Sequence, residues 1–115
     1  FYGILGYSQG CPMATVYIAN SNTSFEKAFL FNGYLPTTHS GLNDTINEVA
    51  PLDVDALIFG GDNDVFIFGV EELEGVYQEP TIIISSTADH HLPTSDDETY
   101  GDVLAFFRQG TNGTL

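Results

Sequence analysis

The stretch ILGYSQGCPM, residues 4–13, places a serine between two glycines at the end of an apolar run. An apolar segment that leads into a glycine-flanked serine predicts a strand that turns sharply into a helix. In so tight a turn, side chains two residues before and after Ser8 would clash, which explains Gly6 and Gly10 in steric terms. We therefore expect the Ser8 hydroxyl to stand above the end of a strand. The Gln9 N–H should face the same space, at the positive end of the following helix.

Four apolar runs divide the chain, and each is apolar on both faces: FYGILGY (1–7), KAFLF (27–31), ALIFGG (56–61) and TIIISS (81–86). This pattern is typical of buried strands in a parallel sheet. Each run is followed by a segment predicted to be a helix: CPMATVYIAN (11–20), LNDTINEV (42–49), GVEELEGVYQ (69–78) and SDDETYGDVLAFFRQ (95–109). The alternation predicts an α/β fold with right-handed crossovers. For the last helix we expect Ser95 as N-cap and Arg108 near the end.

The composition limits the classes of partner. The chain has 115 residues, with 16 Asp and Glu against only Lys27 and Arg108, and a formal net charge of −14. Nucleic acids and anionic membranes need a positive surface, so neither is expected as a partner. A highly soluble protein, a salt-adapted protein and a subunit that faces a basic partner all fit this charge. Cys11 is the only cysteine, which excludes an internal disulfide, and no apolar run is long enough to span a bilayer.

Acidic and histidine side chains follow the third and fourth predicted strands. Asp62 and Asp64 come after residues 56–61, and the pair His90 and His91 comes after residues 81–86. Serine, acid and histidine in this chain order, each after a strand of a parallel sheet, indicate a hydrolytic triad. A solvated acidic loop and a calcium or other metal site are the alternatives. Because His39 is distant in sequence and no cysteine is near, we expect neither a metal nor a cofactor.

These stretches together resemble the fungal-type serine hydrolase (FSH) family, a branch of the α/β-hydrolases. The resemblance runs from about Tyr2 to Phe107 and rests on GILGYSQG, FEKAFLFNGYLP, DALIFGGDND and PTIIISSTADHHLPTSDD. In the family, a glycine–acid–x–Asp loop carries the triad acid, which implies Asp64. The family's histidine is followed by any residue, an aliphatic residue and a proline, which implies His90. The family's nucleophile corresponds to Ser8.

The resemblance covers only the second half of the family's fold. It implies a partial α/β-hydrolase domain over residues 1–109 with a flexible tail over 110–115, completed by a missing N-terminal half or by a partner chain. Without that half, the first strand is an open apolar edge and one oxyanion donor is absent. The chain also departs from the family pattern: Ala88 and Asp89 replace two glycines before His90, and residues 11–13 replace small residues.

The implied activity is hydrolysis of an ester or thioester by Ser8, His90 and Asp64, with the Gln9 N–H as oxyanion donor. Five residues that follow strand ends are candidates for an apolar acyl pocket, with core packing as the alternative for each: Tyr7, Tyr34, Leu35, Phe66 and Leu92. Two other classes stay open, namely a non-catalytic hydrolase-like subunit of a larger assembly and an acidic metal-binding module.

The cellular compartment is not determined by the sequence. The family resemblance implies a cytoplasmic protein. Three Asn-x-Ser/Thr sequons, which we expect in loops, leave a secreted or organellar location open: Asn22, Asn43 and Asn112.

Overall fold

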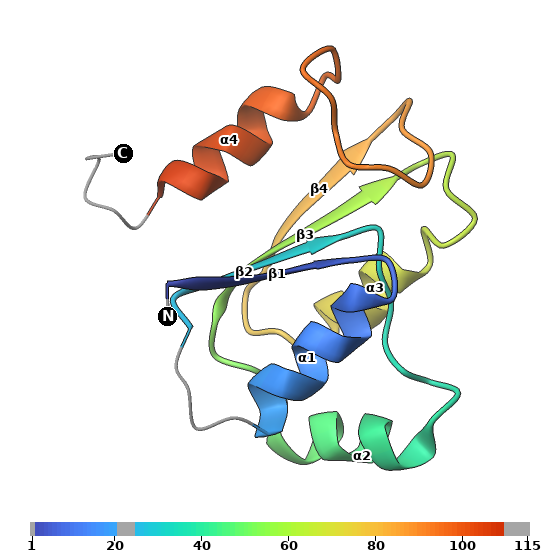
Figure 1. The fold of residues 1–115 in the computed structure, drawn as a ribbon, viewed down its shortest axis with the longest axis vertical. Coiled ribbons are helices and arrows are strands. Elements are labelled where there is room, and N and C mark those ends of the chain that lie inside the picture. The colour runs from blue at the N-terminus through green and yellow to red at the C-terminus, as the bar shows by residue number, and fades with distance from the viewer. Residues whose placement is uncertain (1, 21–24, 110–115) are drawn as a thin grey trace.

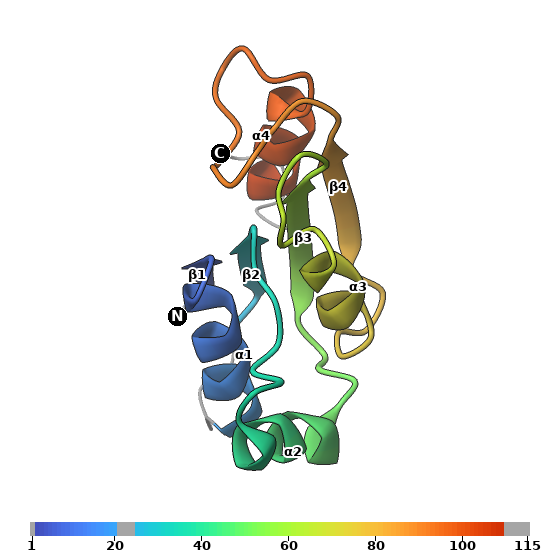
Figure 2. The ribbon, with the colours of Figure 1, turned by 90° about the vertical axis from the view of Figure 1, so that its right-hand side faces the viewer.

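The computed structural model describes residues 2–20 and 25–109. Its strands β1 (Gly3–Tyr7), β2 (Lys27–Phe31), β3 (Asp55–Gly61) and β4 (Thr81–Ser85) form one sheet in the order β1-β2-β3-β4. All three pairings are parallel (Figure 2). The expected α/β fold with a parallel sheet is therefore confirmed.

Helices cover both faces of this sheet. They are α1 (Gly10–Asn20), α2 (Ser40–Val49), α3 (Gly69–Glu74) and α4 (Tyr100–Arg108). Figure 1 shows α4, in orange, on one side of the strands and the other three helices on the opposite side. Within the described residues, the sheet is thus the middle layer of three.

Alternate residues of the central strands enter two separate cores, which explains why the strands are apolar on both faces. Ala28, Leu30 and Ile58 pack with α1, α2 and α3. Phe29 and Phe31, together with Leu57 and Phe59, pack with Val103 and Phe106 of α4. The register pairs Tyr7 with Phe31 and Phe31 with Phe59, so the loops that follow the strands lie together at the carboxyl ends of the strands.

The last helix begins four residues later than an N-cap at Ser95 predicts. The Asp97 carboxylate accepts hydrogen bonds from the Ser85 hydroxyl at 2.6 Å and from the Thr99 N–H at 2.8 Å. These bonds hold residues 95–99 in turns against the end of β4, and α4 starts only at Tyr100. The prediction of Ser95 as N-cap is therefore wrong, because a contact with a distant strand outweighs the local capping signal.

The third helix is also shorter than predicted, ending at Glu74 instead of residue 78. Beyond it, Tyr77 forms a β-bridge with Leu52, and its buried hydroxyl hydrogen-bonds Thr15 of α1 at 2.8 Å. Burial raises the pKa of this phenol, against the smaller lowering effect of the Thr15 hydrogen bond. These tertiary contacts pull residues 76–77 out of the helix.

One of the three sequons lies in a helix and not in a loop. Asn43 is part of α2, whose N-cap is His39; the His39 Nδ1 accepts the Leu42 N–H at 3.2 Å. The loop placement predicted for Asn43 is therefore wrong. The sequons at Asn22 and Asn112, and the tail predicted over 110–115, lie outside the described residues.

Candidate active site

Ser8 occupies a strained turn between β1 and α1. Its φ of 55° is left-handed, a backbone conformation that costs a non-glycine residue on the order of 1 kcal/mol. Hydrogen bonds on both sides hold it there: the Ser8 N–H donates to the Phe31 carbonyl at 2.9 Å, and the Cys11 N–H donates to the Ser8 carbonyl at 3.0 Å. The turn raises the serine side chain above the carboxyl ends of the strands.

The two glycines of the turn play different parts. A Cβ on Gly6 would lie 2.6 Å from the Gly10 carbonyl oxygen, so only glycine fits at this position. A Cβ on Gly10 would meet no described atom within 4 Å outside its own helix and chain neighbours. The prediction that both glycines prevent a clash is right for Gly6 and wrong for Gly10.

Three side chains from three loops form a continuous hydrogen-bonded chain. The His90 Nε2 lies 2.8 Å from the Ser8 Oγ, and the His90 Nδ1 lies 2.7 Å from the Asp64 Oδ2. Because a carboxylate only accepts hydrogen bonds, the Nδ1–H donates to Asp64 and the Nε2 lone pair faces the serine hydroxyl. The parallel register brings Ser8 and His90 together although 82 positions separate them in the sequence.

Asp64 is held as an anion. Its burial raises the pKa of the carboxyl, but hydrogen bonds from the Phe66 N–H, His90 and Asn32 outweigh burial and hold the pKa below its usual value. The Phe66 N–H donates to Oδ1 at 2.9 Å, and the side chain of Asp64 is buried. Asp62, the other candidate acid, is exposed to solvent. The structure therefore brings Asp64, and not Asp62, to the histidine.

Asn32 is a site residue that the sequence analysis missed. It lies directly after β2 with a φ of 56°, and it is 2% exposed. Its Nδ2 donates to the Asp64 Oδ2 at 3.4 Å and to the Asp89 carbonyl at 3.3 Å, so it joins two of the site loops. Its Oδ1 is buried and accepts no hydrogen bond within the described residues. A polar residue directly after a buried strand was the available signal.

The loop that carries His90 is fixed through its backbone. The Asp89 Oδ1 accepts the His90 N–H at 2.8 Å, so this carboxylate binds the main chain and not the imidazole ring. The Tyr7 hydroxyl donates to the His90 carbonyl at 2.7 Å, and the two rings lie 5.4 Å apart. The departure at Asp89 therefore supports the loop conformation, and Tyr7 contacts the histidine segment.

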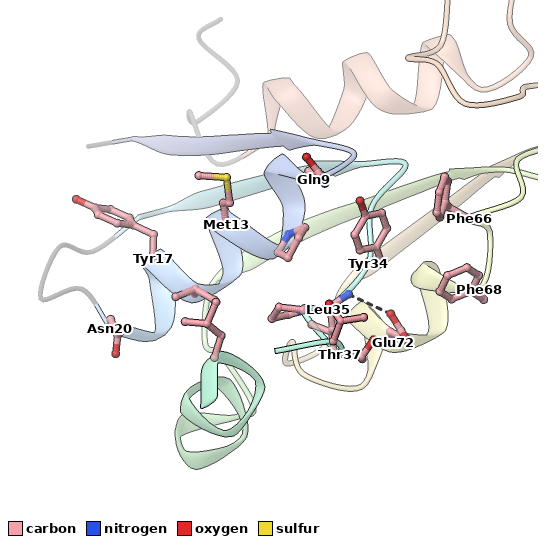
Figure 3. Close-up of a pocket in the computed structure, with 15 residues that line it drawn as sticks. Gln9, Met13, Tyr17, Asn20, Tyr34, Leu35, Thr37, Phe66, Phe68 and Glu72 are labelled. Carbon is pink, nitrogen blue, oxygen red and sulfur yellow. Dashed lines mark hydrogen bonds between the residues drawn. The ribbon is translucent and has the colours of Figure 1, made fainter. Parts of the chain in front are cut away.

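An apolar groove of about 720 Å³ runs along α1 beside this cluster (Figure 3). Of the predicted pocket residues, Tyr34, Leu35 and Phe66 line it, whereas Tyr7 and the exposed Leu92 do not. The sequence did not predict the lining residues on helix faces and beyond the site loop, among them Met13, Tyr17, Leu42 and Phe68. Which face of α1 turns toward the groove depends on how the helix packs on the sheet, which the sequence does not state.

The Gln9 backbone N–H lies at the start of α1. Gln9 lies between Ser8 and the first residue of the eleven-residue helix α1, where backbone N–H groups carry a partial positive charge. Its N–H makes no hydrogen bond within residues 2–20 and 25–109. It can therefore donate to an oxygen bound at Ser8.

Metal coordination has no cluster to support it in the described part of the chain. No group of three or more His, Cys, Asp or Glu side chains lies close enough there to hold an ion. The His91 Nδ1 donates to the Leu92 carbonyl at 2.9 Å, and His39 caps α2. The buried Cys11 thiol donates to the Gly6 and Phe31 carbonyls, and burial raises its pKa to about 12.

Comparison with known proteins gives one family. The family model described as Serine hydrolase (FSH1) matches residues 1–100, whereas no curated protein matches the chain. Across residues 2–20 and 25–109, no helix has the length and apolar character needed to cross a membrane. Because the family match covers most of the sequence, from the turn at Ser8 to the histidine pair, the chain belongs to the serine hydrolase (FSH1) family.

Proposed function

We propose that the chain carries the acyl-transfer centre of a serine carboxylesterase that hydrolyses an ester or thioester. The observation that carries this proposal is the chain of hydrogen bonds from the Ser8 hydroxyl through His90 to the anionic Asp64, built on a strained turn. A serine hydroxyl is a weak nucleophile until a neighbouring base takes its proton, and the neutral imidazole offers that base.

In the first half-reaction, the Ser8 Oγ attacks the carbonyl carbon while the His90 Nε2 takes the hydroxyl proton. Asp64 keeps the proton on Nδ1 and stabilises the imidazolium that forms. The Gln9 N–H donates to the oxyanion of the tetrahedral intermediate. When the intermediate collapses, His90 returns the proton to the leaving alcohol or thiol, and the acyl group stays on Ser8.

In the second half-reaction, water replaces the leaving group. His90 takes a proton from the water as its oxygen attacks the acyl carbon, and a second tetrahedral intermediate forms. Its collapse breaks the bond to Oγ, His90 returns the proton to Ser8, and the carboxylic acid leaves. The cycle needs no cofactor and no metal.

The proposal includes a second segment, from a longer chain or a partner, that pairs with β1. The hydrogen bonds of the Tyr2 carbonyl and the Ser8 N–H go to β2. Alternation along a parallel strand therefore directs the backbone groups of three residues to the other edge: Gly3, Leu5 and Tyr7. Leu5 is also 54% exposed. A strand added here would cover this edge and bring a second oxyanion donor near Gln9.

A fluorophosphonate probe tests the nucleophile directly, because it reacts with activated serines. The full gene product should be labelled, Ser8→Ala should lose the labelling, and Ser95→Ala, an exposed serine outside the site, should keep it. Esterase activity on p-nitrophenyl acetate should follow the same pattern. Absence of labelling in the folded, assembled protein would contradict the proposal and favour the non-catalytic hydrolase-like subunit.

A further inference from the structure

We infer that the groove along α1 binds the hydrocarbon tail of the substrate's acyl group, and that the enzyme prefers straight chains of about twelve carbons. This inference rests on the proposed esterase function. Three features of the groove carry it: its near end is lined by Gln9, the residue after the reacting serine, its length is defined by α1, and its walls are mostly apolar.

The near end of the groove lies against the catalytic cluster. Gln9 follows the nucleophile directly, and Phe66 has its ring 5.2 Å from the His90 ring. Tyr34 stands beside Phe66, with 5.3 Å between ring centroids. The preceding Gly33 packs so closely on the turn that a Cβ there would lie 2.1 Å from the Cys11 Cβ. An acyl group on Ser8 would therefore reach the groove past Gln9, alongside these aromatic rings.

The length of the groove follows from the helix that forms its wall. Figure 3 shows Gln9, Met13 and Tyr17 in sequence along α1, with Asn20 at the far end. Eleven residues of helix rise about 16 Å. Three backbone bonds span about 3.6 Å when extended, so this length holds roughly a dozen carbon–carbon bonds. A straight chain of that length fills the groove from the serine to its far end.

The residues that line the groove suit an uncharged acyl chain. Met13 is 71% exposed and Tyr17 is 50% exposed, which leaves apolar surface that a bound tail would cover. Leu42 of α2 and Leu35 also line the groove. Glu72 is the charged residue of the lining, and its Oε1 already accepts the Leu35 N–H at 3.0 Å. Burial of methylene groups is therefore the main source of binding energy along the groove.

Hydrolysis of p-nitrophenyl acetate, butyrate, octanoate and dodecanoate by the full gene product tests the inference, with each ester below its micellar concentration. If an open groove covers half of each methylene, kcat/KM should rise about twofold per carbon. The rise should stop beyond about twelve carbons, where the groove ends. Hexadecanoate should therefore gain nothing over dodecanoate.

Two variants that add the same charge at different positions test where the acyl chain of the substrate binds. Met13→Glu puts a carboxylate into the groove, whereas Val49→Glu puts one on an exposed position of α2 outside it. We expect Met13→Glu to lower the ratio of kcat/KM for dodecanoate to that for acetate at least tenfold, and Val49→Glu to leave the ratio unchanged. Leu42→Trp, which narrows the groove from α2, should lower the same ratio.

The outcomes separate this inference from the function on which it rests. If kcat/KM does not change with acyl chain length but hydrolysis still requires Ser8, the inference about the groove is wrong and the proposed esterase function stands. Equal dodecanoate-to-acetate ratios of kcat/KM for Met13→Glu and Val49→Glu would lead to the same conclusion. Loss of Ser8-dependent hydrolysis for every ester would overturn the esterase and this inference together.

Discussion

Two pairs of acidic and basic side chains lie at opposite ends of the sheet. The N–O distance is the same in both, but the partner exposed to solvent is the acid in one pair and the base in the other. At the start of β2 and β3, the Lys27 Nζ lies 2.7 Å from the Asp55 Oδ2. Beyond the carboxyl ends, the His90 Nδ1 lies 2.7 Å from the Asp64 Oδ2. In the first pair the basic side chain is 2% exposed and the acid is 50% exposed; in the second the histidine is 30% exposed and the acid is 1% exposed.

This difference shows why an ion-pair distance alone does not indicate a reactive site. Lys27 is enclosed, with its ammonium 4.0 Å from the centre of the Phe106 ring, and its contact with Asp55 joins the starts of β2 and β3. His90 has an enclosed anion on one side and the Ser8 hydroxyl on the other, which is the arrangement that the proposed mechanism requires.

The largest expected effect comes from Asp64→Asn. The amide would present an N–H to His90 Nδ1 and stabilise the wrong tautomer, so kcat should fall about 10⁴-fold while the protein stays folded. Asp62→Asn changes the exposed neighbour in the same loop and should keep most of the activity. Steady-state kinetics with p-nitrophenyl acetate compares the two, and equal losses would show that Asp64 has no special role.

Substitutions in the Lys27–Asp55 pair should change the free energy of unfolding. Asp55→Asn leaves the Lys27 ammonium buried without its anion and should lower the free energy of unfolding by about 2–3 kcal/mol. Lys27→Met keeps the aliphatic stem and leaves Asp55 in solvent, so its cost should be about 1 kcal/mol or less. Urea unfolding of both variants measures the asymmetry. A larger cost for Lys27→Met would mean that the ammonium itself stabilises the fold.

A smaller effect should come from Asn32→Leu. Without the amide, Asp64 and the Asp89 carbonyl each lose a donor, and His90 loses part of its support, so kcat should fall about tenfold. KM should not change, because Asn32 is outside the lining of the groove. Asn43→Leu is the matched control, since its Oδ1 is also buried without a partner in the described residues. A change confined to KM would contradict the positioning role.

The smallest effect concerns Asp97, which lies beside the site loops but not in the catalytic chain. Burial raises its pKa, yet hydrogen bonds from Ser85 and Thr99 outweigh burial and hold the pKa below its usual value. Because the folded pKa is lowered, its stabilisation is complete at neutral pH and disappears as the pH falls below about 4. Asp97→Asn should therefore cost about 1 kcal/mol at pH 7 and progressively less in acid.

Unfolding of the wild type and Asp97→Asn side by side, between pH 7 and pH 3, checks this dependence. The difference between the two proteins is the relevant quantity, because protonation of the other acids changes the stability of both. A difference that is the same at pH 3 and pH 7 would show that the carboxylate charge does not contribute.

The catalytic candidates were predictable because each follows a recognisable strand. Ser8, Asp64 and His90 come after apolar runs in the order that places them at one edge of a parallel sheet, and the predicted run 27–31 coincides with β2. Asn32 follows that same strand, but only the fold shows that its Nδ2 donates hydrogen bonds to Asp64 and to the Asp89 carbonyl. A single buried amide has no sequence pattern that distinguishes a structural role from a functional one.

By itself, the sequence determined the α/β fold, the strained turn at Ser8 and the family, because these depend on local apolar runs and on residue spacing. Only the tertiary structure decided where α4 begins, that Gly10 avoids no clash, and which face of α1 lines the groove. Those features depend on contacts between residues far apart in the chain, such as Asp97 with Ser85. The energies of such contacts exceed the local preferences on which sequence patterns depend.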